Sequence, residues 1–245
     1  MQAAELLDET VGDLDLEKPM TLQIGLSSPS GFVIASDKLV QIKHDATRMH
    51  SAMTDKIRVI SQNGLVVASA GVDPPPQFAD DLSKKWGSEP PIEVLRRVAK
   101  SYASPDPMAR ATPQYEFIVG CSRENEIWQI VIKGAGHTVA KYDKATTAMS
   151  FLLAAFLPEH FYSSDLPLSD LETIAALTIW YGEQQGSTTV RGLGGVTCEN
   201  GRVEEWSAKK IASLVKRCEL IHAKIRAAIV ESYAPTHTTS NSGQS

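Results

Sequence analysis

The chain of 245 residues lacks the cysteine and histidine patterns that mark disulfide-rich or metal-binding proteins. It has three cysteines, Cys121, Cys198 and Cys218, which form no CxxC pair and leave an odd count. This disfavours a disulfide framework and a structural zinc site. The six histidines are scattered and form no HExxH motif. Free structural thiols and ordinary histidines are therefore expected, and no metal or organic cofactor.

Long apolar runs and an excess of basic residues are also missing. No apolar run reaches the roughly 18 residues that a membrane-spanning helix requires. The segment Met1 to Glu17 has six acids and no Lys or Arg, so it lacks the basic-then-apolar order of a secretory signal. The net charge of −5 argues against a nucleic-acid binder. We expect a cytoplasmic protein with neither a membrane nor a nucleic-acid partner.

The composition divides the chain into one domain and two polar ends. Residues 1–20 form an acidic leader that is poor in aromatics and ends at Pro19-Met20. Residues 234–245 are polar with few apolar side chains, which is typical of a disordered tail. The 42% hydrophobic content of the chain is enough for a single folded domain, which we place at residues 21–233.

Apolar patterning within this domain predicts alternating blocks of strands and helices. Asn63-Gly64 separates two strand-like runs, a strong signal for a β-hairpin. Pro91 opens a segment with apolar residues at helical spacing. The expected strands are 21–26, 32–37, 56–60, 65–70, 115–121, 127–132, 137–140, 188–196 and 203–206, with 38–53 as a polar loop. The expected helices are 76–86, 91–103, 147–156, 168–181 and 208–233. Blocks in this order predict an α+β fold with packed sheets and helices outside.

Three segments carry a resemblance to a known family: TLQIGLSSPSGFVIASDK from Thr21, then TDKIRVI, then LVVASAG. Together they resemble the start of a proteasome β-type subunit or of its bacterial relatives, which are N-terminal-nucleophile hydrolases. Thr21 stands at the position of the family's catalytic threonine, and Gly25, Asp37, Lys56 and Gly71 match its other marker residues. The resemblance implies a four-layer αββα sandwich.

The resemblance also implies a mechanism that requires no cofactor. Thr21 would be the nucleophile, and its own α-amine, with an ordinary pKa of about 7.7–8.0, would be the base once Thr21 begins the chain. Lys56 would lower the pKa of that amine and stabilise the alkoxide, and Asp37 would hold Lys56 charged. The Gly71 N–H would stabilise the oxyanion. Residues 1–20 must then be removed, by self-cleavage or because Met20 is the true initiator and is trimmed.

Further site residues follow from their positions in the family pattern. The residues expected to border the side-chain pocket are Val40, Ser69 and Asp73, and they favour a medium or basic substrate side chain. The residues expected to support the threonine are Thr147, Glu183 and Ser187, although the local sequence matches the family poorly there.

The resulting hypothesis is a threonine-type hydrolase of peptide bonds that acts on peptides or unfolded proteins. It would assemble into a homo-oligomeric ring or a related assembly. Two alternatives stay open. One is a catalytically inactive scaffold or ring subunit of the same fold, favoured by the N-terminal extension. The other is a small-molecule amidase, since a fold does not determine a substrate.

Overall fold

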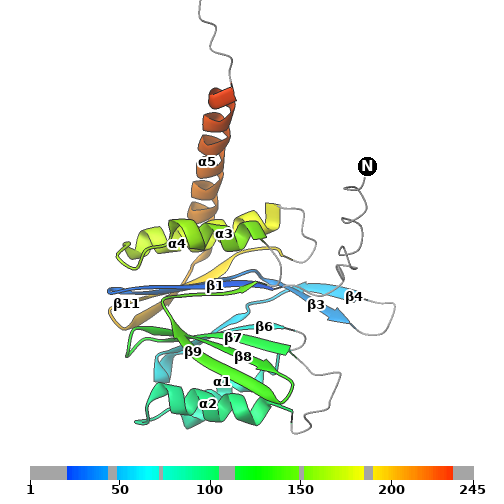
Figure 1. The fold of residues 1–245 in the computed structure, drawn as a ribbon, viewed down its shortest axis with the longest axis vertical. Coiled ribbons are helices and arrows are strands. Elements are labelled where there is room, and N and C mark those ends of the chain that lie inside the picture. The colour runs from blue at the N-terminus through cyan, green and yellow to red at the C-terminus, as the bar shows by residue number, and fades with distance from the viewer. Residues whose placement is uncertain are drawn as a thin grey trace, which may run out of the picture.

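The fold of the chain comes from a computed structural model. It describes residues 21–43, 49–71, 74–104, 114–148, 152–184 and 190–233. Two antiparallel sheets lie face to face, and helices cover the outer face of each (Figure 1). In the described part of the chain, none of the helices combines the length and apolar character that spanning a bilayer requires.

The first sheet has the strand order β10-β1-β2-β11-β12. Its strands are β1 (Leu22–Ser28), β2 (Gly31–Ser36), β10 (Lys144–Ala148), β11 (Gly194–Glu199) and β12 (Arg202–Glu205). The second sheet has the order β5-β6-β7-β8-β9. Its strands are β5 (Ile57–Ile60), β6 (Leu65–Gly71), β7 (Gln114–Cys121), β8 (Glu126–Lys133) and β9 (Gly136–Tyr142). A separate hairpin pairs β3 (Leu39–Lys43) with β4 (Met49–Met53).

Three apolar cores fill the spaces between the four layers. Helices α3 (Leu152–Phe161) and α4 (Leu168–Gln184) cover the first sheet, and α1 (Gln77–Lys85) and α2 (Pro91–Tyr102) cover the second. Side chains on successive strand residues point to opposite faces. In β2, Val33 and Ala35 therefore belong to the core under α4, while Phe32 and Ile34 belong to the core between the sheets. Because both faces are buried, these strands read as continuous apolar runs.

Strand β1 shows how closely the two sheets approach. Leu22, Ile24 and Leu26 pack towards the helices of the first layer. The alternate residues face the second sheet, where a Cβ added to Gly25 would lie 2.9 Å from the Ile118 side chain. Glycine at this position therefore allows β1 to lie against β7 and β8 near the start of the domain.

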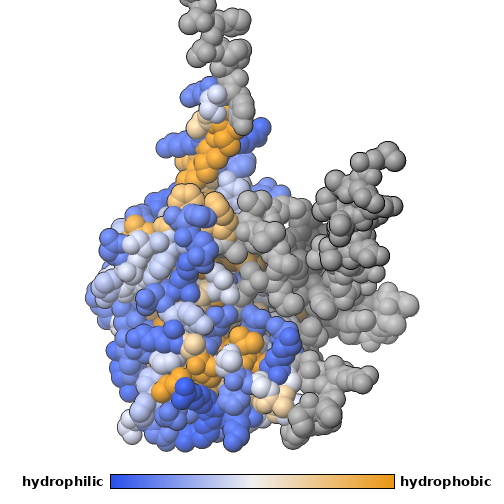
Figure 2. All heavy atoms as spheres, in the orientation of Figure 1, coloured by the Kyte–Doolittle hydropathy of each residue, from blue (hydrophilic) through white to orange (hydrophobic). Residues whose placement is uncertain are grey.

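The last helix, α5 (Ala208–Tyr233), begins beside α4 and then extends away from the body of the molecule (Figure 1). Its first half packs against the core through Leu214 and Cys218. Its second half has exposed apolar side chains, including Ile225 and Ile229, and forms an orange stripe on the projecting part of the helix (Figure 2).

The predicted fold class, an α+β four-layer αββα sandwich, is confirmed. Three predictions for individual elements are wrong. The polar loop expected at 38–53 contains β3 and β4, the helix expected from Thr147 begins at Leu152, and the strand expected from Thr188 begins at Gly194. Residues 144–148 instead form β10, because they complete the backbone hydrogen bonds of β1. The leader, the tail, Asp73 and Ser187 lie outside the described residues.

Candidate active site

Thr21, Asp37 and Lys56 come together at one end of the two sheets. Thr21 directly precedes β1, Asp37 directly follows the antiparallel strand β2, and Lys56 directly precedes β5 of the second sheet. The start of β1 lies beside the end of β2, since Gln23 pairs with Ser36. Antiparallel pairing of β1 and β2 therefore places Thr21 and Asp37 at the same end of the first sheet. The stacking of the two sheets brings Lys56 to that end as well.

Lys56 joins the other two side chains through its ammonium group. Its Nζ donates a hydrogen bond of 3.0 Å to Thr21 Oγ1 and one of 2.8 Å to Asp37 Oδ2. The ion pair with Asp37 is buried, with 6% of the Lys56 side chain and none of the Asp37 side chain exposed. The hydroxyl of Thr21 therefore lies next to a positive charge that is largely shielded from water.

Asp37 is held by the backbone on both sides of the site. Its Oδ1 accepts a hydrogen bond of 2.9 Å from the Leu22 N–H, and its Oδ2 accepts one of 3.2 Å from the Leu39 N–H. The Asp37 N–H donates in turn to the Leu22 carbonyl at 3.1 Å. Leu22 is thus tied to Asp37 twice, which determines the position of the adjacent Thr21.

Burial shifts the pKa values of this pair against their charged forms. Desolvation raises the pKa of Asp37 above its ordinary value, although Lys56 and the two backbone N–H groups act in the opposite direction. Desolvation likewise lowers the pKa of Lys56, partly offset by Asp37. Both shifts oppose the charged forms of the pair, and such perturbed pKa values are common at functional sites.

Gly71 ends β6 in a backbone conformation that requires glycine. Its φ is +121°, and a Cβ at this position would lie 2.3 Å from the carbonyl oxygen of Gln114. Strand β6 lies between β5, which follows Lys56, and β7. Gly71 therefore lies at the end of β6, and β6 pairs with β5, the strand that directly follows Lys56.

The other predicted site residues within the described ranges lie in four different elements. Val40 lies in β3, opposite Ala52, and is half-buried. Ser69 lies in β6, two residues before Gly71, and is half-buried. Glu183 lies in the last turn of α4, and no ion pair within the described ranges includes it. The backbone of Thr147 pairs with Gln23 in β1. These four residues keep their predicted roles as hypotheses.

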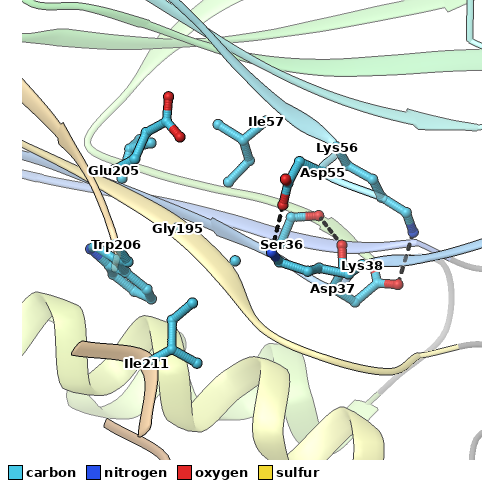
Figure 3. A pocket seen from close by; sticks show the side chains of 12 residues that line it. Ser36, Asp37, Lys38, Asp55, Lys56, Ile57, Gly195, Glu205, Trp206 and Ile211 are labelled. Carbon is cyan, nitrogen blue, oxygen red and sulfur yellow. Dashed lines mark hydrogen bonds and ion pairs between the residues drawn. The ribbon is translucent and has the colours of Figure 1, made fainter. Parts of the chain in front are cut away.

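A pocket of about 110 Å³ lies beside the buried ion pair (Figure 3). Asp37 and Lys56 form part of its wall, together with Gly195 of β11 and Trp206, which directly follows β12. Lys38 and Asp55, the neighbours of the buried pair, form a second ion pair of 2.6 Å, drawn as a dashed line. This outer pair is solvent-accessible, in contrast to the inner one.

Sequence reasoning missed two features of this site. One is the Lys38–Asp55 pair; charges adjacent to Asp37 and Lys56 were the available signal. The other is Gln23, a fully buried amide between the apolar residues Leu22 and Ile24 of β1. A polar residue in the middle of an apolar run was the signal for it, because a buried amide requires a hydrogen-bond partner.

Comparison with known proteins gives a structural likeness without close sequence relatives. No protein-family model matches the chain, and no curated protein matches its sequence. Among solved structures it is similar to Anbu (ancestral beta-subunit) from Yersinia bercovieri, with a TM-score of 0.58, 12% identity, and coverage of 88% of this chain and 98% of that one. It is also similar to Anbu from Hyphomicrobium sp. strain MC1, with a TM-score of 0.59, 14% identity, and coverage of 87% and 98%. A Gly-1 mutant of the Hyphomicrobium protein gives a TM-score of 0.57 at 14% identity, with coverage of 88% and 98%.

These likenesses correct the family suggested by the sequence. The structural neighbours are Anbu proteins, a distinct proteasome-like family, so the identification with proteasome β-type subunits is wrong. At identities of 12–14% the likeness shows the fold, which is of the proteasome-like, N-terminal-nucleophile hydrolase type.

Proposed function

We propose that the chain is a threonine-type N-terminal-nucleophile hydrolase of peptide bonds, with Thr21 as the nucleophile. The observation that carries the proposal is the buried Lys56, whose Nζ lies within hydrogen-bond distance of both Thr21 Oγ1 and Asp37 Oδ2. An ion pair with a purely structural role does not require a hydroxyl group beside its cation. An activated threonine does, because its alkoxide needs a nearby cation.

In the first chemical step, Thr21 Oγ1 attacks the carbonyl carbon of the substrate and its proton passes to the α-amine of Thr21. The new C–O bond forms as the carbonyl π electrons move to oxygen, and the Gly71 N–H stabilises that oxyanion. Lys56 stabilises the developing charge on Oγ1, and its lowered pKa makes it a stronger hydrogen-bond donor. The protonated amine then gives its proton to the leaving nitrogen as the C–N bond breaks.

In the second step, water completes the cycle. The α-amine accepts a proton from water, whose oxygen attacks the ester carbonyl of the acyl-enzyme. The bond to Thr21 Oγ1 breaks, and that oxygen regains a proton from the amine. Each proton removed from a nucleophile is returned to a leaving group, so the cycle balances without a metal or an organic cofactor.

This mechanism requires a free α-amine on Thr21. We therefore expect the native protein, purified from its own cells, to begin at Thr21, after removal of residues 1–20 or after trimming of an initiator Met20. Intact-mass measurement and N-terminal sequencing test this directly. A mature chain that retains residues before Thr21 would leave the amine in a peptide bond, and the inactive scaffold would then become the better interpretation.

The same proposal includes self-assembly, for which α5 offers a surface. Its projecting half has exposed Ile225, Ile229 and Val230. From residue 216 to 233 the helix has four Lys or Arg against two Glu. Residues 152–184, which comprise α3, α4 and the connection between them, have five acids and no Lys or Arg. Exposed Phe156 and Phe161 add apolar surface to α3. Complementary charge and apolar surface make a second copy the occupant we propose for α5.

We expect the wild-type chain to sediment as a dimer or a larger assembly at micromolar concentration. The double variant Ile225→Glu/Ile229→Glu should be monomeric, because it places charge in the apolar stripe. Sedimentation velocity over a range of concentrations measures this. The matched control is Ala212→Glu/Ser213→Glu, which changes exposed positions in the first half of the same helix and should leave assembly intact. A monomeric wild-type chain, or equal effects of the two variants, would reject α5 as the interface.

A further inference from the structure

Gln23 is a buried polar residue in the layer between the two sheets. It lies in β1, two residues after Thr21, and its side chain is completely inaccessible to solvent. Strand alternation places it on the same face as Gly25, where an added Cβ would lie 2.9 Å from the Ile118 side chain of the second sheet. The neighbouring core between the sheets is formed by apolar side chains such as Ile34 and Ala68. A single amide at the site end of this layer is an exception that calls for a role.

The amide of Gln23 connects the two sheets. Its Nε2 donates a hydrogen bond of 2.6 Å to the carbonyl of Ser69 in β6. The Ser69 N–H donates in turn to the carbonyl of Lys56 at 3.1 Å. Through these two bonds the strand that follows Thr21 is linked to the strand that ends at Gly71, and to the backbone of Lys56.

This connection matters because apolar packing alone is non-directional. Contacts between aliphatic side chains hold two sheets together, but they tolerate small shifts that a hydrogen bond of defined length resists. Thr21 Oγ1 and Lys56 Nζ belong to segments flanking different sheets and are 3.0 Å apart. A relative shift of about 1 Å at this distance is enough to reduce a reaction rate by about 100-fold.

We infer that Gln23 is a positioning residue that sets the distance between Thr21 on one sheet and Lys56 and Gly71 on the other. The inference rests on the proposed function for its catalytic consequence, but the geometry it describes is independent of turnover. Gln23 acts through the carbonyl of Ser69 and is not itself expected to contact the substrate.

The chain offers a matched control for this role. Gln129 in β8 also links the sheets, since its Nε2 donates a hydrogen bond of 3.2 Å to the carbonyl of Thr146 in β10. Neither β8 nor β10 contains Thr21, Lys56 or Gly71 or adjoins them in sequence, although β10 pairs with β1. Gln23→Met and Gln129→Met therefore remove the same kind of bond, with nearly the same side-chain volume, at different distances from the site.

The first readout uses the variant Thr21→Cys in the full chain. Its thiol would lie beside the Lys56 ammonium, which lowers a cysteine pKa below the ordinary value of about 8.5. The rate of alkylation by iodoacetamide as a function of pH measures this pKa. The native cysteines, Cys121, Cys198 and Cys218, are buried and should not react in the folded chain. The second readout is kcat and KM for peptide hydrolysis, measured with the threonine in place.

We expect Gln23→Met to raise the pKa of the thiol at position 21 towards 8.5 and to lower kcat by about 10- to 100-fold with little change in KM. Gln129→Met should leave both quantities near those of the parent while lowering the urea midpoint to a similar extent. The inference is overturned if the two variants have the same thiol pKa and the same kcat. A wild-type chain without hydrolase activity would reject the proposed function, and the thiol measurement would still test the position of Gln23.

Discussion

Replacing Thr21 by alanine should abolish peptide hydrolysis while leaving the fold intact. The variant keeps Lys56 and Asp37 but removes the hydroxyl that Lys56 Nζ contacts at 3.0 Å. Loss of a nucleophile that acts through a covalent intermediate typically lowers kcat by about 10⁴-fold or more. Thr21 precedes β1 and is half-buried, so the truncation removes little packing. The measurement is kcat/KM on fluorogenic peptides, beside a urea unfolding curve for each protein.

Thr21→Ser is the matched control, since serine keeps both the hydroxyl and the α-amine. It should retain measurable hydrolysis and the same N-terminus. Alanine and threonine chains with activities within tenfold of each other would show that another residue is the nucleophile. If a chain beginning at Thr21 cleaves small amides but no peptide, the amidase alternative is favoured. Cleavage of neither would favour the inactive scaffold.

Replacing Lys56 by methionine should destabilise the protein in a pH-dependent way. Asp37 would keep its two backbone hydrogen bonds but lose its cation at a site with no solvent exposure. Breaking a buried pair by removing one partner costs about 3–5 kcal/mol. Lys56 is the largest influence that lowers the pKa of Asp37, so its removal raises a pKa that burial has already raised.

The direction of the pH effect follows from this raised pKa. A carboxyl group whose pKa is higher in the folded than in the unfolded state stabilises the folded protein when it is protonated. This stabilisation is lost as the pH rises through the folded-state pKa. The deficit of Lys56→Met relative to wild type should therefore be small at pH 5 and largest at pH 8. Urea unfolding at pH 5, 6.5 and 8 measures it.

Lys38→Met provides the control for this experiment. It breaks the neighbouring Lys38–Asp55 pair, whose side chains are 29% and 73% exposed. Exposed pairs contribute about 0–1 kcal/mol, so the loss should be small and nearly the same at each pH. Equal losses in the two variants, or a Lys56→Met deficit that does not grow with pH, would contradict the interpretation of Asp37 as a buried carboxylate dependent on Lys56.

Much of the fold was accessible to sequence analysis because both faces of the central strands are covered. Runs such as residues 65–70, apolar at nearly every position, predict strands directly. Strand β10 was missed because its sequence, KATTA, has little apolar content, and pairing with β1 makes it a strand. Strands β3 and β4 were missed because they pair with each other, apart from the two main sheets, in a segment that contains many polar residues.

The meeting of Thr21, Asp37 and Lys56 was predicted from the resemblance to a known family, because the strand-like runs alone do not single out these three residues. Their assignment to roles remains a prediction. The partner of Gln23 could not be anticipated, because it is a backbone carbonyl, and every residue carries one. When two side chains interact, both residue types are visible in the sequence. When a side chain binds a backbone carbonyl, the sequence indicates the side chain but not its partner.

The strand order of the first sheet has a consequence for folding kinetics. Strands β1 and β2 come first in the chain, yet they lie between β10 and β11, which are synthesised more than a hundred residues later. Pairings between such distant segments form slowly, and a chain leaving the ribosome cannot make them until its second half has emerged. The sheet that carries Thr21 is thus completed late. Any cleavage that depends on the finished site would follow synthesis of nearly the whole domain, so a nascent chain could not hydrolyse its neighbours prematurely.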